Sequence, residues 1–318
     1  MVTATQGVAS VLSPLSGRDF LSSEDVSAEQ AAALLQLAQQ LKSGDRRIDL
    51  GNRVLGLIFT KASTRTRVSF QVAMARLGGQ TVDLNPQVTQ LGRGEPLEDT
   101  ARVLSRFCDA LAIRTFAQQE LVDYAHWASI PVINALTDLE HPCQALADYL
   151  TMQEAFGELQ GQTLAYVGDG NNVAHSLMIC GALLGVNVRI GCPEGFEPLP
   201  GVVDQARALA VAGAQITVTS DPVAAVKGAQ ALYTDVWASM GQEQEQAERE
   251  QAFKGFCLDE ALVAEAEPDA IVLHCLPAHR GEEISAGVME GSASRIFDQA
   301  ENRLHAQQAL LAALMGGL

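Results

Sequence analysis

Short apolar runs alternate with longer stretches of helical period along almost the whole chain. The longer stretches are rich in Ala, Leu and Gln, as in Ala28–Leu41 and Asp204–Val211. Regular alternation of strands and helices is typical of parallel sheets covered by helices, so the pattern predicts an α/β fold. The runs that predict strands are Val54–Phe59, Thr81–Leu84, Ala110–Arg114, Val132–Ala135, Thr163–Val167, Val186–Ile190, Gln215–Thr219, Ala231–Asp235 and Ala270–His274.

The chain has 318 residues, a length that favours two domains. A long helical stretch, Pro142–Phe156, is followed by the loop Gly157–Gly161, after which a new series of strands begins. We therefore expect one domain over residues 1–150 and a second, Rossmann-like domain over residues 151–299. Each should hold a parallel sheet flanked by helices. The Ala- and Leu-rich segment 300–318 is expected to form a helix that packs back on the first domain.

Charge and composition narrow the possible functions. The chain has 21 Lys and Arg against 38 Asp and Glu, a net charge of −17, which argues against a nucleic-acid partner. No apolar run approaches the roughly 20 residues of a membrane span, and Met1–Asp19 do not resemble a signal peptide. The six cysteines are scattered and form no C-x-x-C pair, which predicts reduced thiols in a cytoplasmic protein. An acidic protein that binds an anion must gather its arginines at one place.

Two arginines occur together in the segment Ser63-Thr64-Arg65-Thr66-Arg67, between a predicted strand and a predicted helix. A helix N-terminus offers unpaired N–H groups and the positive end of the helix dipole, and arginine can bind two phosphate oxygens at once. The simpler interpretation is a cluster of capping residues beside a solvated turn. In so acidic a chain the two arginines favour a phosphate site. Arg67 lies further into the helix and is expected to pair with an acidic neighbour instead.

A second candidate site is His141-Pro142-Cys143-Gln144, because proline suits the first turn of a helix. His141 and Gln144 would then lie one turn apart at a helix start, where both could hydrogen-bond a carbonyl oxygen that gains charge. Taken alone, the motif is explained better by a helix cap with a satisfied histidine.

Three further motifs follow predicted strands, and in open α/β sheets ligands bind at the carboxyl ends of strands. Asp235, at the start of Asp235–Gly241, is as well suited to holding a substrate ammonium as to capping its loop. The spacing of the segment His274–Arg280 fits no zinc pattern, and His274 is a poor base for a Cys275 nucleophile because neighbours on a strand point to opposite faces. The loop Gly168–Asn172 lacks the third glycine of a dinucleotide loop, although Asn172 could contact a substrate.

Together these motifs resemble those of the aspartate/ornithine carbamoyltransferase family. The S-T-R-T-R and H-P-x-Q segments are similar to the family's carbamoyl phosphate sites. The D-x-x-x-S-M-G and H-C-L-P segments are similar to those of its ornithine branch. The motifs occur in the family's order, and the resemblance runs from about Asp19 to the final helix. It implies a first domain that binds carbamoyl phosphate, a second that binds the amino acid, a homotrimer, and no metal or other cofactor.

The resemblance also implies the residues of the site. The catalytic residues would be Arg114, His141 and Cys275. The ornithine site would be formed by Asn172, Asp235, Ser239 and Met240. Carbamoyl phosphate would be bound by Ser63, Thr64, Arg65, Thr66, Gln90, Arg114, His141, Pro142, Cys143, Gln144, Cys275, Leu276 and Arg303.

Alternative substrates can be weighed on the same residues. The aspartate branch uses a lysine in the loop that corresponds to Gln87–Glu95, which here contains Arg93 and no lysine. A putrescine branch departs from S-M-G. The sequence therefore favours transfer of the carbamoyl group to L-ornithine, giving L-citrulline and phosphate. The alternative to an enzyme is a catalytically silent, regulatory member of the family. The presence of all the arginines and of His141 argues against it. Thr60 stands where the family often has an acidic residue.

Overall fold

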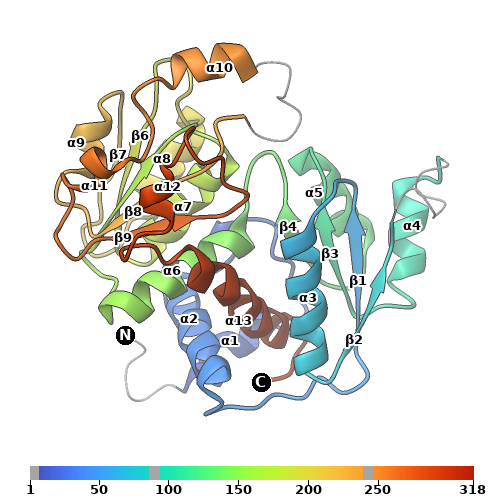
Figure 1. Cartoon of the computed structure of the whole chain (residues 1–318). Coiled ribbons are helices and arrows are strands. Elements are labelled where there is room, and N and C mark those ends of the chain that lie inside the picture. Colours follow the sequence, from blue (N-terminus) through green and yellow to red (C-terminus); the bar gives the residue numbers. More distant parts are fainter. Residues whose placement is uncertain (1–6, 86–93, 239–245) are drawn as a thin grey trace. The chain divides into compact units, whose positions relative to one another are not determined.

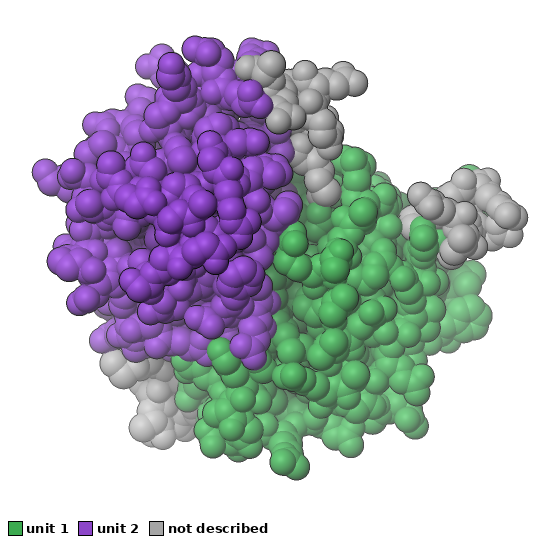
Figure 2. Space-filling model, viewed as in Figure 1, with its two compact units in different colours: residues 1–147, 303–318 green, residues 148–302 purple. Residues whose placement is uncertain are grey.

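The computed structural model describes residues 7–85, 94–238 and 246–318. The chain forms two compact units, drawn in green and purple in Figure 2. Unit 1 comprises Met1–Ala147 and Arg303–Leu318, and unit 2 comprises Asp148–Asn302. The chain passes from unit 1 to unit 2 within helix α6 (Pro142–Phe156) and returns within α13 (Ile296–Leu314).

Unit 1 contains a parallel sheet with the strand order β2-β1-β3-β4. Its central strands consist almost wholly of buried apolar residues, as expected for a sheet covered on both faces. All the strands point the same way, so the segments after β1 and β3 leave from the same edge of the sheet (Figure 1). The strands are β1 (Val54–Phe59), β2 (Gln80–Asp83), β3 (Ala110–Arg114) and β4 (Val132–Leu136).

Local sequence signals explain where helices of unit 1 begin and end. In α2, Ser27 and Gln30 form a capping box at the start, and Gly44 ends the helix with a φ of 81°. Residues of α4 and α5 pack with β1 and β3 in one apolar cluster, which covers one face of the sheet. The helices are α1 (Val8–Leu12), α2 (Ala28–Ser43), α3 (Thr64–Arg76), α4 (Leu97–Leu104) and α5 (Gln118–Trp127), with 3-10 turns at Ser13–Leu15 and Ser23–Asp25.

Unit 2 contains a parallel sheet with the order β7-β6-β5-β8-β9. The chain moves outward from β5 to β7 and then returns to the other side of β5, so the strand order reverses between β5 and β8. Such a switch point brings the loops after these two strands together at the carboxyl edge of the sheet. The strands are β5 (Thr163–Val167), β6 (Asn187–Gly191), β7 (Ile216–Thr219), β8 (Ala231–Thr234) and β9 (Ile271–His274).

An apolar cluster in unit 2 gathers side chains of β5, β8 and β9 with aromatic residues that follow β8. Trp237 and Phe253 stack with ring centroids 5.7 Å apart, which joins the segment after β8 to the end of α10. The helices are α7 (Asn172–Leu183), α8 (Pro200–Leu209), α9 (Pro222–Val226), α10 (Gln246–Ala252), α11 (Glu260–Val263) and α12 (Ala286–Met289).

The structure confirms the predicted α/β fold with two parallel sheets. Each predicted strand is present, and its ends differ from the prediction by a single residue at most. The helices differ more from the prediction. Helix α8 begins at Pro200 where Asp204 was expected, and α13 begins at Ile296 where residue 300 was expected. The run Gln242–Gln251 is rich in Gln and Glu, which predicts a solvated loop or helix face; of its side chains whose burial is described, Glu248, Glu250 and Gln251 are exposed, whereas Arg249 on α10 is buried. No helix among the described residues is long and apolar enough to cross a membrane.

Candidate active site

The S-T-R-T-R segment joins β1 to the first turn of α3. Ser63 is the N-cap residue of α3, yet its side chain makes no capping hydrogen bond within the described residues. Its hydroxyl instead lies 3.4 Å from Nη1 of Arg114, the last residue of β3. The interpretation of Ser63 as a side-chain cap therefore fails. Because the hydroxyl does not cap the helix, the first turn of α3 presents its N–H groups beside an arginine, as an anion site requires.

A second arginine reaches this helix from the far end of the chain. Arg303, on α13, donates from Nη2 to Oγ1 of Thr66 at 2.8 Å. Both residues are buried, with exposed fractions of 3% and 1%. Arg114 is also buried, so two guanidinium groups are held at the start of α3 with little solvent around them. Their electrostatic effect on a bound anion is larger here than it would be in water.

His141 lies beside these arginines at the start of α6. Its side chain is 4% exposed. Burial, and then the positive charges of Arg303, Arg114 and Arg65, hold the pKa of His141 well below its usual range. The imidazole is therefore neutral near pH 7 and can donate one hydrogen bond without carrying a charge.

The turn before His141 is anchored by buried hydrogen bonds. The carboxylate of Glu140 accepts hydrogen bonds from the hydroxyl of Ser22 and from the hydroxyl and N–H of Ser23, the latter two at 2.8 and 3.1 Å. On the other side, Cys143 Sγ donates to the carbonyl of Asn134 at 3.3 Å, and burial raises the pKa of this thiol to about 12. Cys143 thus contributes a neutral packing group. Gln144, one turn into α6, is also buried.

Arg67 differs from Arg65, as the sequence suggested. It forms an ion pair with Asp83 of β2, and its guanidinium lies 4.8 Å from the ring centroid of Phe59. A cavity of about 520 Å³ next to this pair is lined by Phe59, Thr60, Lys61, Ala62, Ser63, Thr64, Arg67, Val68 and Asn85.

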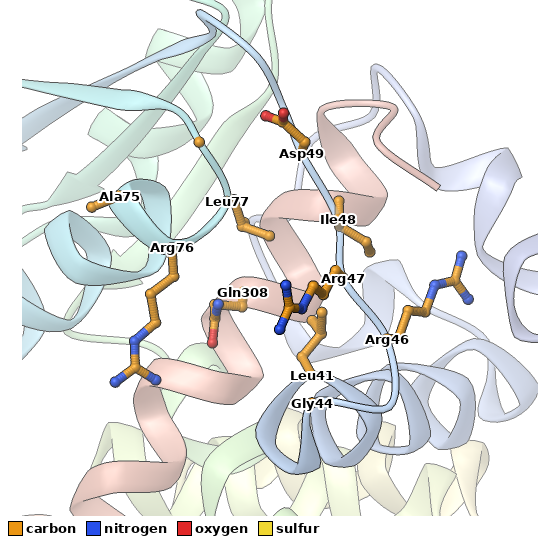
Figure 3. A pocket seen from close by; sticks show the side chains of 11 residues that line it. Leu41, Gly44, Arg46, Arg47, Ile48, Asp49, Ala75, Arg76, Leu77 and Gln308 are labelled. Carbon is orange, nitrogen blue, oxygen red and sulfur yellow. The ribbon is translucent and has the colours of Figure 1, made fainter.

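A separate pocket of unit 1, of about 610 Å³, contains none of the motif residues. It lies where the end of α3 and the segment after α2 meet α13, and Figure 3 shows it from close by. Arg47 and Arg76 are exposed, and the side chain of Arg46 turns away from Gln308 (Figure 3). A pocket lined by solvent-exposed arginines differs from the buried arrangement around His141.

In unit 2 the polar residues gather on Asp235, which follows β8. Its carboxylate accepts from Asn171 Nδ2 at 2.9 Å, from Cys275 Sγ at 2.9 Å and from the N–H of Val236 at 2.8 Å. Asp235 is 6% exposed. These contacts fix the orientation of a buried carboxylate at the switch point of the sheet, which is the environment expected for binding a substrate ammonium.

Cys275 has the chemistry of a neutral thiol. Burial, and then the charge of Asp235, raise the pKa of Cys275 well above its usual value. A protonated thiol that donates to a carboxylate is a poor nucleophile. The arrangement therefore argues against covalent catalysis by Cys275 and in favour of a hydrogen-bonding role.

The loop after β5 holds a residue that the sequence did not single out. Asn171 caps α7, since its Oδ1 accepts the N–H groups of Val173 and Ala174 at 2.9 and 3.3 Å, while its Nδ2 donates to Asp235. The sequence pointed to the next residue, Asn172. An asparagine directly before a helix is a common N-cap, so the sequence could have predicted the cap at Asn171. It could not have predicted the contact of Asn171 with Asp235.

Arg249 is another functional candidate that the sequence missed. Its Nη1 donates to Asp169 Oδ2 at 2.9 Å and to the carbonyl of Trp237 at 2.8 Å. The guanidinium also lies 5.0 Å from the ring centroid of Phe196. Arg249 therefore connects the loop after β5 to the segment that follows Asp235.

Two groups of possible metal ligands occur among the described residues. In each group one donor atom per residue lies within 4.8 Å of the others: Asp235, His274 and Cys275 in one, and His279, Glu282 and Glu283 in the other. In the first, the His274 ring and the Cys275 thiol already hydrogen-bond Leu276 and Asp235 respectively. Gln90, Ser239 and Met240, which were also predicted in the site, lie outside the described residues.

Two family models match the chain. Residues 18–154 match the carbamoyl-P binding domain of aspartate/ornithine carbamoyltransferase, and residues 160–314 match its Asp/Orn binding domain. The chain is 83% identical over 318 residues to the ornithine carbamoyltransferase of Parasynechococcus marenigrum (strain WH8102), and the match covers 100% of both chains. It is 82% identical, also over 100% of both chains, to that of Prochlorococcus marinus (strain MIT 9313).

Solved structures agree with these matches. The ornithine carbamoyltransferase from Gloeobacter violaceus is 56% identical, with a TM-score of 0.86 over 94% of this chain and 98% of that chain. The one from Pyrococcus furiosus is 50% identical, with a TM-score of 0.92 over 96% and 99%. By its two domains, its sequence and its fold, the chain belongs to the aspartate/ornithine carbamoyltransferase family.

Proposed function

We propose that this protein is an ornithine carbamoyltransferase, which transfers the carbamoyl group of carbamoyl phosphate to the δ-amine of L-ornithine and releases L-citrulline and phosphate. The observation that carries the proposal is the buried, neutral His141 with Arg65, Arg114 and Arg303 close enough to lower its pKa. Three cations suit a phosphate that leaves with negative charge, and a neutral imidazole suits a carbonyl oxygen. The direction that makes citrulline serves arginine biosynthesis, and the same residues would serve the reverse reaction.

Each unit has its own part in the proposal. Unit 1 binds carbamoyl phosphate and unit 2 binds ornithine, as the descriptions of the two matching family models suggest. The phosphate lies on the N-terminus of α3, held by Ser63, Thr64, Arg65 and Thr66. The carbamoyl group lies near Arg114, His141 and Gln144, with Gln90, Pro142, Cys143, Cys275, Leu276 and Arg303 completing the site.

Catalysis follows from positions and fixed charges. The δ-amine attacks the carbamoyl carbon, and the oxygen gains negative charge that His141, Arg114 and Thr66 stabilise. Phosphate then leaves, with its charge held by Arg65 and the N–H groups of α3. No covalent enzyme intermediate is needed, in accord with the protonated thiol of Cys275.

Ornithine binding needs charges of the opposite sign. The oriented carboxylate of Asp235 holds an ammonium group of ornithine, with Asn172, Ser239 and Met240 beside it. The attacking δ-amine must first lose a proton from a group whose pKa is about 10.4 in water. The rate is therefore expected to rise from neutral to mildly alkaline pH, and a flat profile would contradict the mechanism.

We also propose that the protein acts as a homotrimer in the cytoplasm. The trimer rests on the sequence resemblance, and the location on the scattered free cysteines. Light scattering of the purified protein should give three times the mass of one chain. The mass of a single chain would contradict the proposed trimer but would leave the proposed reaction unaffected.

The decisive assay measures citrulline with carbamoyl phosphate and ornithine, while carbamoylation of putrescine and of aspartate is followed in parallel. Turnover of ornithine alone supports the proposal. Turnover of putrescine instead would favour the amine branch, and no turnover would favour a silent, regulatory member. Arg65→Ala should lower kcat/KM by about 10³-fold or more. Arg67→Ala is the matched control, because Arg67 is paired with Asp83, and it should retain most of the activity.

A further inference from the structure

A buried histidine, His274 of the H-C-L-P segment, is paired with a buried glutamate, Glu283. His274 ends β9 and is 1% exposed, and Glu283 is 0% exposed. The ring Nδ1 of His274 accepts the N–H of Leu276 at 2.8 Å. A nitrogen that accepts an N–H carries no proton, so the proton of the neutral ring is on Nε2. Nε2 therefore donates to Glu283 Oε1, 3.0 Å away.

Both members of the pair have further anchors. The backbone N–H of His274 donates to Gln299 Oε1 at 2.8 Å. Glu283 Oε1 also accepts the N–H of His279 at 2.6 Å. The carboxylate thus joins the two ends of the segment 274–279, and the imidazole ring fixes the middle of it.

The middle of this turn needs such support. Leu276 has a φ of 61°, in the left-handed region that residues other than glycine rarely adopt. Such a conformation persists only where its surroundings hold it. Leu276 directly follows Cys275, whose thiol is directed at Asp235. A change in the turn would therefore move both Leu276, a residue of the proposed carbamoyl phosphate site, and the thiol next to it.

We propose that His274, oriented by Glu283, is a positioning residue that holds Leu276 and Cys275 in the geometry the reaction requires. The proposal rests on the proposed function, because it assigns His274 no contact with a substrate. The ring acts through the N–H of Leu276, and the carboxylate acts through the ring.

Two substitutions of His274 separate this role from simple filling of space. Asparagine places its amide oxygen where Nδ1 lies and can still accept the N–H of Leu276. Glutamine extends toward position 283 but does not supply that acceptor. Both are made in a Glu283→Gln chain, so that no carboxylate is left buried without its ring partner. Glu283→Gln alone keeps an oxygen acceptor in place of Oε1 and is the reference.

One readout is the rate at which iodoacetamide alkylates Cys275 in a Cys257→Ser background. Cys257 is the other partly exposed cysteine, since Cys108, Cys143, Cys180 and Cys192 are buried. Loss of the turn frees the thiol from Asp235, so His274→Gln should speed alkylation by about tenfold, whereas His274→Asn should stay close to the reference. The second readout is kcat/KM for carbamoyl phosphate, which should fall about tenfold or more in the glutamine variant and be largely retained with asparagine.

Tyr149→Phe is the control for general loss of stability. It removes a buried hydroxyl of unit 2 that donates to the carbonyl of Leu177 at 2.6 Å. This variant should alter neither the alkylation rate nor kcat/KM by more than its thermal stability explains. Equal alkylation and equal kcat/KM for the asparagine and glutamine variants would overturn the proposal. If the wild type makes no citrulline while the alkylation pattern holds, the proposed function fails and the positioning role stands.

Discussion

Arg303 donates a hydrogen bond to the hydroxyl of Thr66 across 237 positions of sequence. Thr66 belongs to the first turn of α3, and Arg303 to a helix at the other end of the chain. The contact lies within unit 1, so the final helix supplies a cation to the segment that the sequence predicted as a phosphate site. The last helix is therefore part of the candidate site as well as of the core of unit 1.

Replacing Arg303 should weaken carbamoyl phosphate binding and slow the reaction. Arg303→Met removes a buried cation and the hydrogen bond to Thr66, so kcat/KM for carbamoyl phosphate should fall about 10²-fold or more. Steady-state kinetics with carbamoyl phosphate varied would measure the loss. Arg295→Met, on the segment before α13, is the control, because among the described residues the side chain of Arg295 donates only to the carbonyls of Ser292 and Ser294. If both variants behave alike, Arg303 has only a structural role.

The lowered pKa of His141 predicts a pH dependence of stability. In the unfolded chain the imidazole takes up a proton near pH 6.5, whereas burial and the arginines oppose protonation in the folded state. Below pH 6.5 the unfolded state binds the extra proton. The stability due to neutral His141 is therefore complete above this pH and is lost as pH falls, by up to about 1.4 kcal/mol per pH unit.

Urea unfolding of the wild type and of His141→Gln between pH 7.5 and about 5 tests this dependence. The free energies of unfolding should converge as the pH falls, because glutamine does not titrate. A constant difference over this range would show that His141 is protonated equally in both states.

Arg249 should matter for ornithine more than for carbamoyl phosphate. Arg249→Met breaks the contacts with Asp169 and with the carbonyl of Trp237, two residues after Asp235. The KM for ornithine should rise about tenfold, with a smaller change in the KM for carbamoyl phosphate. The exposed Arg207, which pairs with Asp204 on α8, provides the control variant Arg207→Met. Equal losses for both substrates would contradict the assignment.

Asn171 offers a test that keeps the helix cap. Asn171→Ser retains a side-chain oxygen for the N–H groups of α7 but loses the donor to Asp235. The freed carboxylate should turn from its bound orientation, and the KM for ornithine should rise several-fold while thermal stability changes little. Asn171→Asp keeps the cap but places a second negative charge beside Asp235, so it should be worse than serine. A ranking with serine worse than aspartate would refute this role for Asn171.

Much of the fold could be predicted because its signals are local. The strand Ala110–Arg114 coincides with an apolar run, and α6 begins and ends where Pro142 and Phe156 suggested. The candidate anion site at Ser63–Thr66 could be proposed for the same reason, since a strand, a polar turn and a helix follow one another directly. The sequence predicted that Arg67 would pair with an acidic residue, but it did not identify Asp83 as that residue.

The sequence by itself determined where the strands lie, which turn carries the arginines and which family the motifs resemble. The tertiary structure decided which side chains meet: Arg303 with Thr66, Asn171 with Asp235, and Arg249 with Asp169. The physical reason is that hydrophobic period and turn chemistry act over a few residues, whereas these contacts depend on sheet order and on the return of α13 to unit 1. Arg249 illustrates the difference, because the polar run around it predicted exposure, whereas in the structure it is buried and paired with Asp169, far earlier in the sequence.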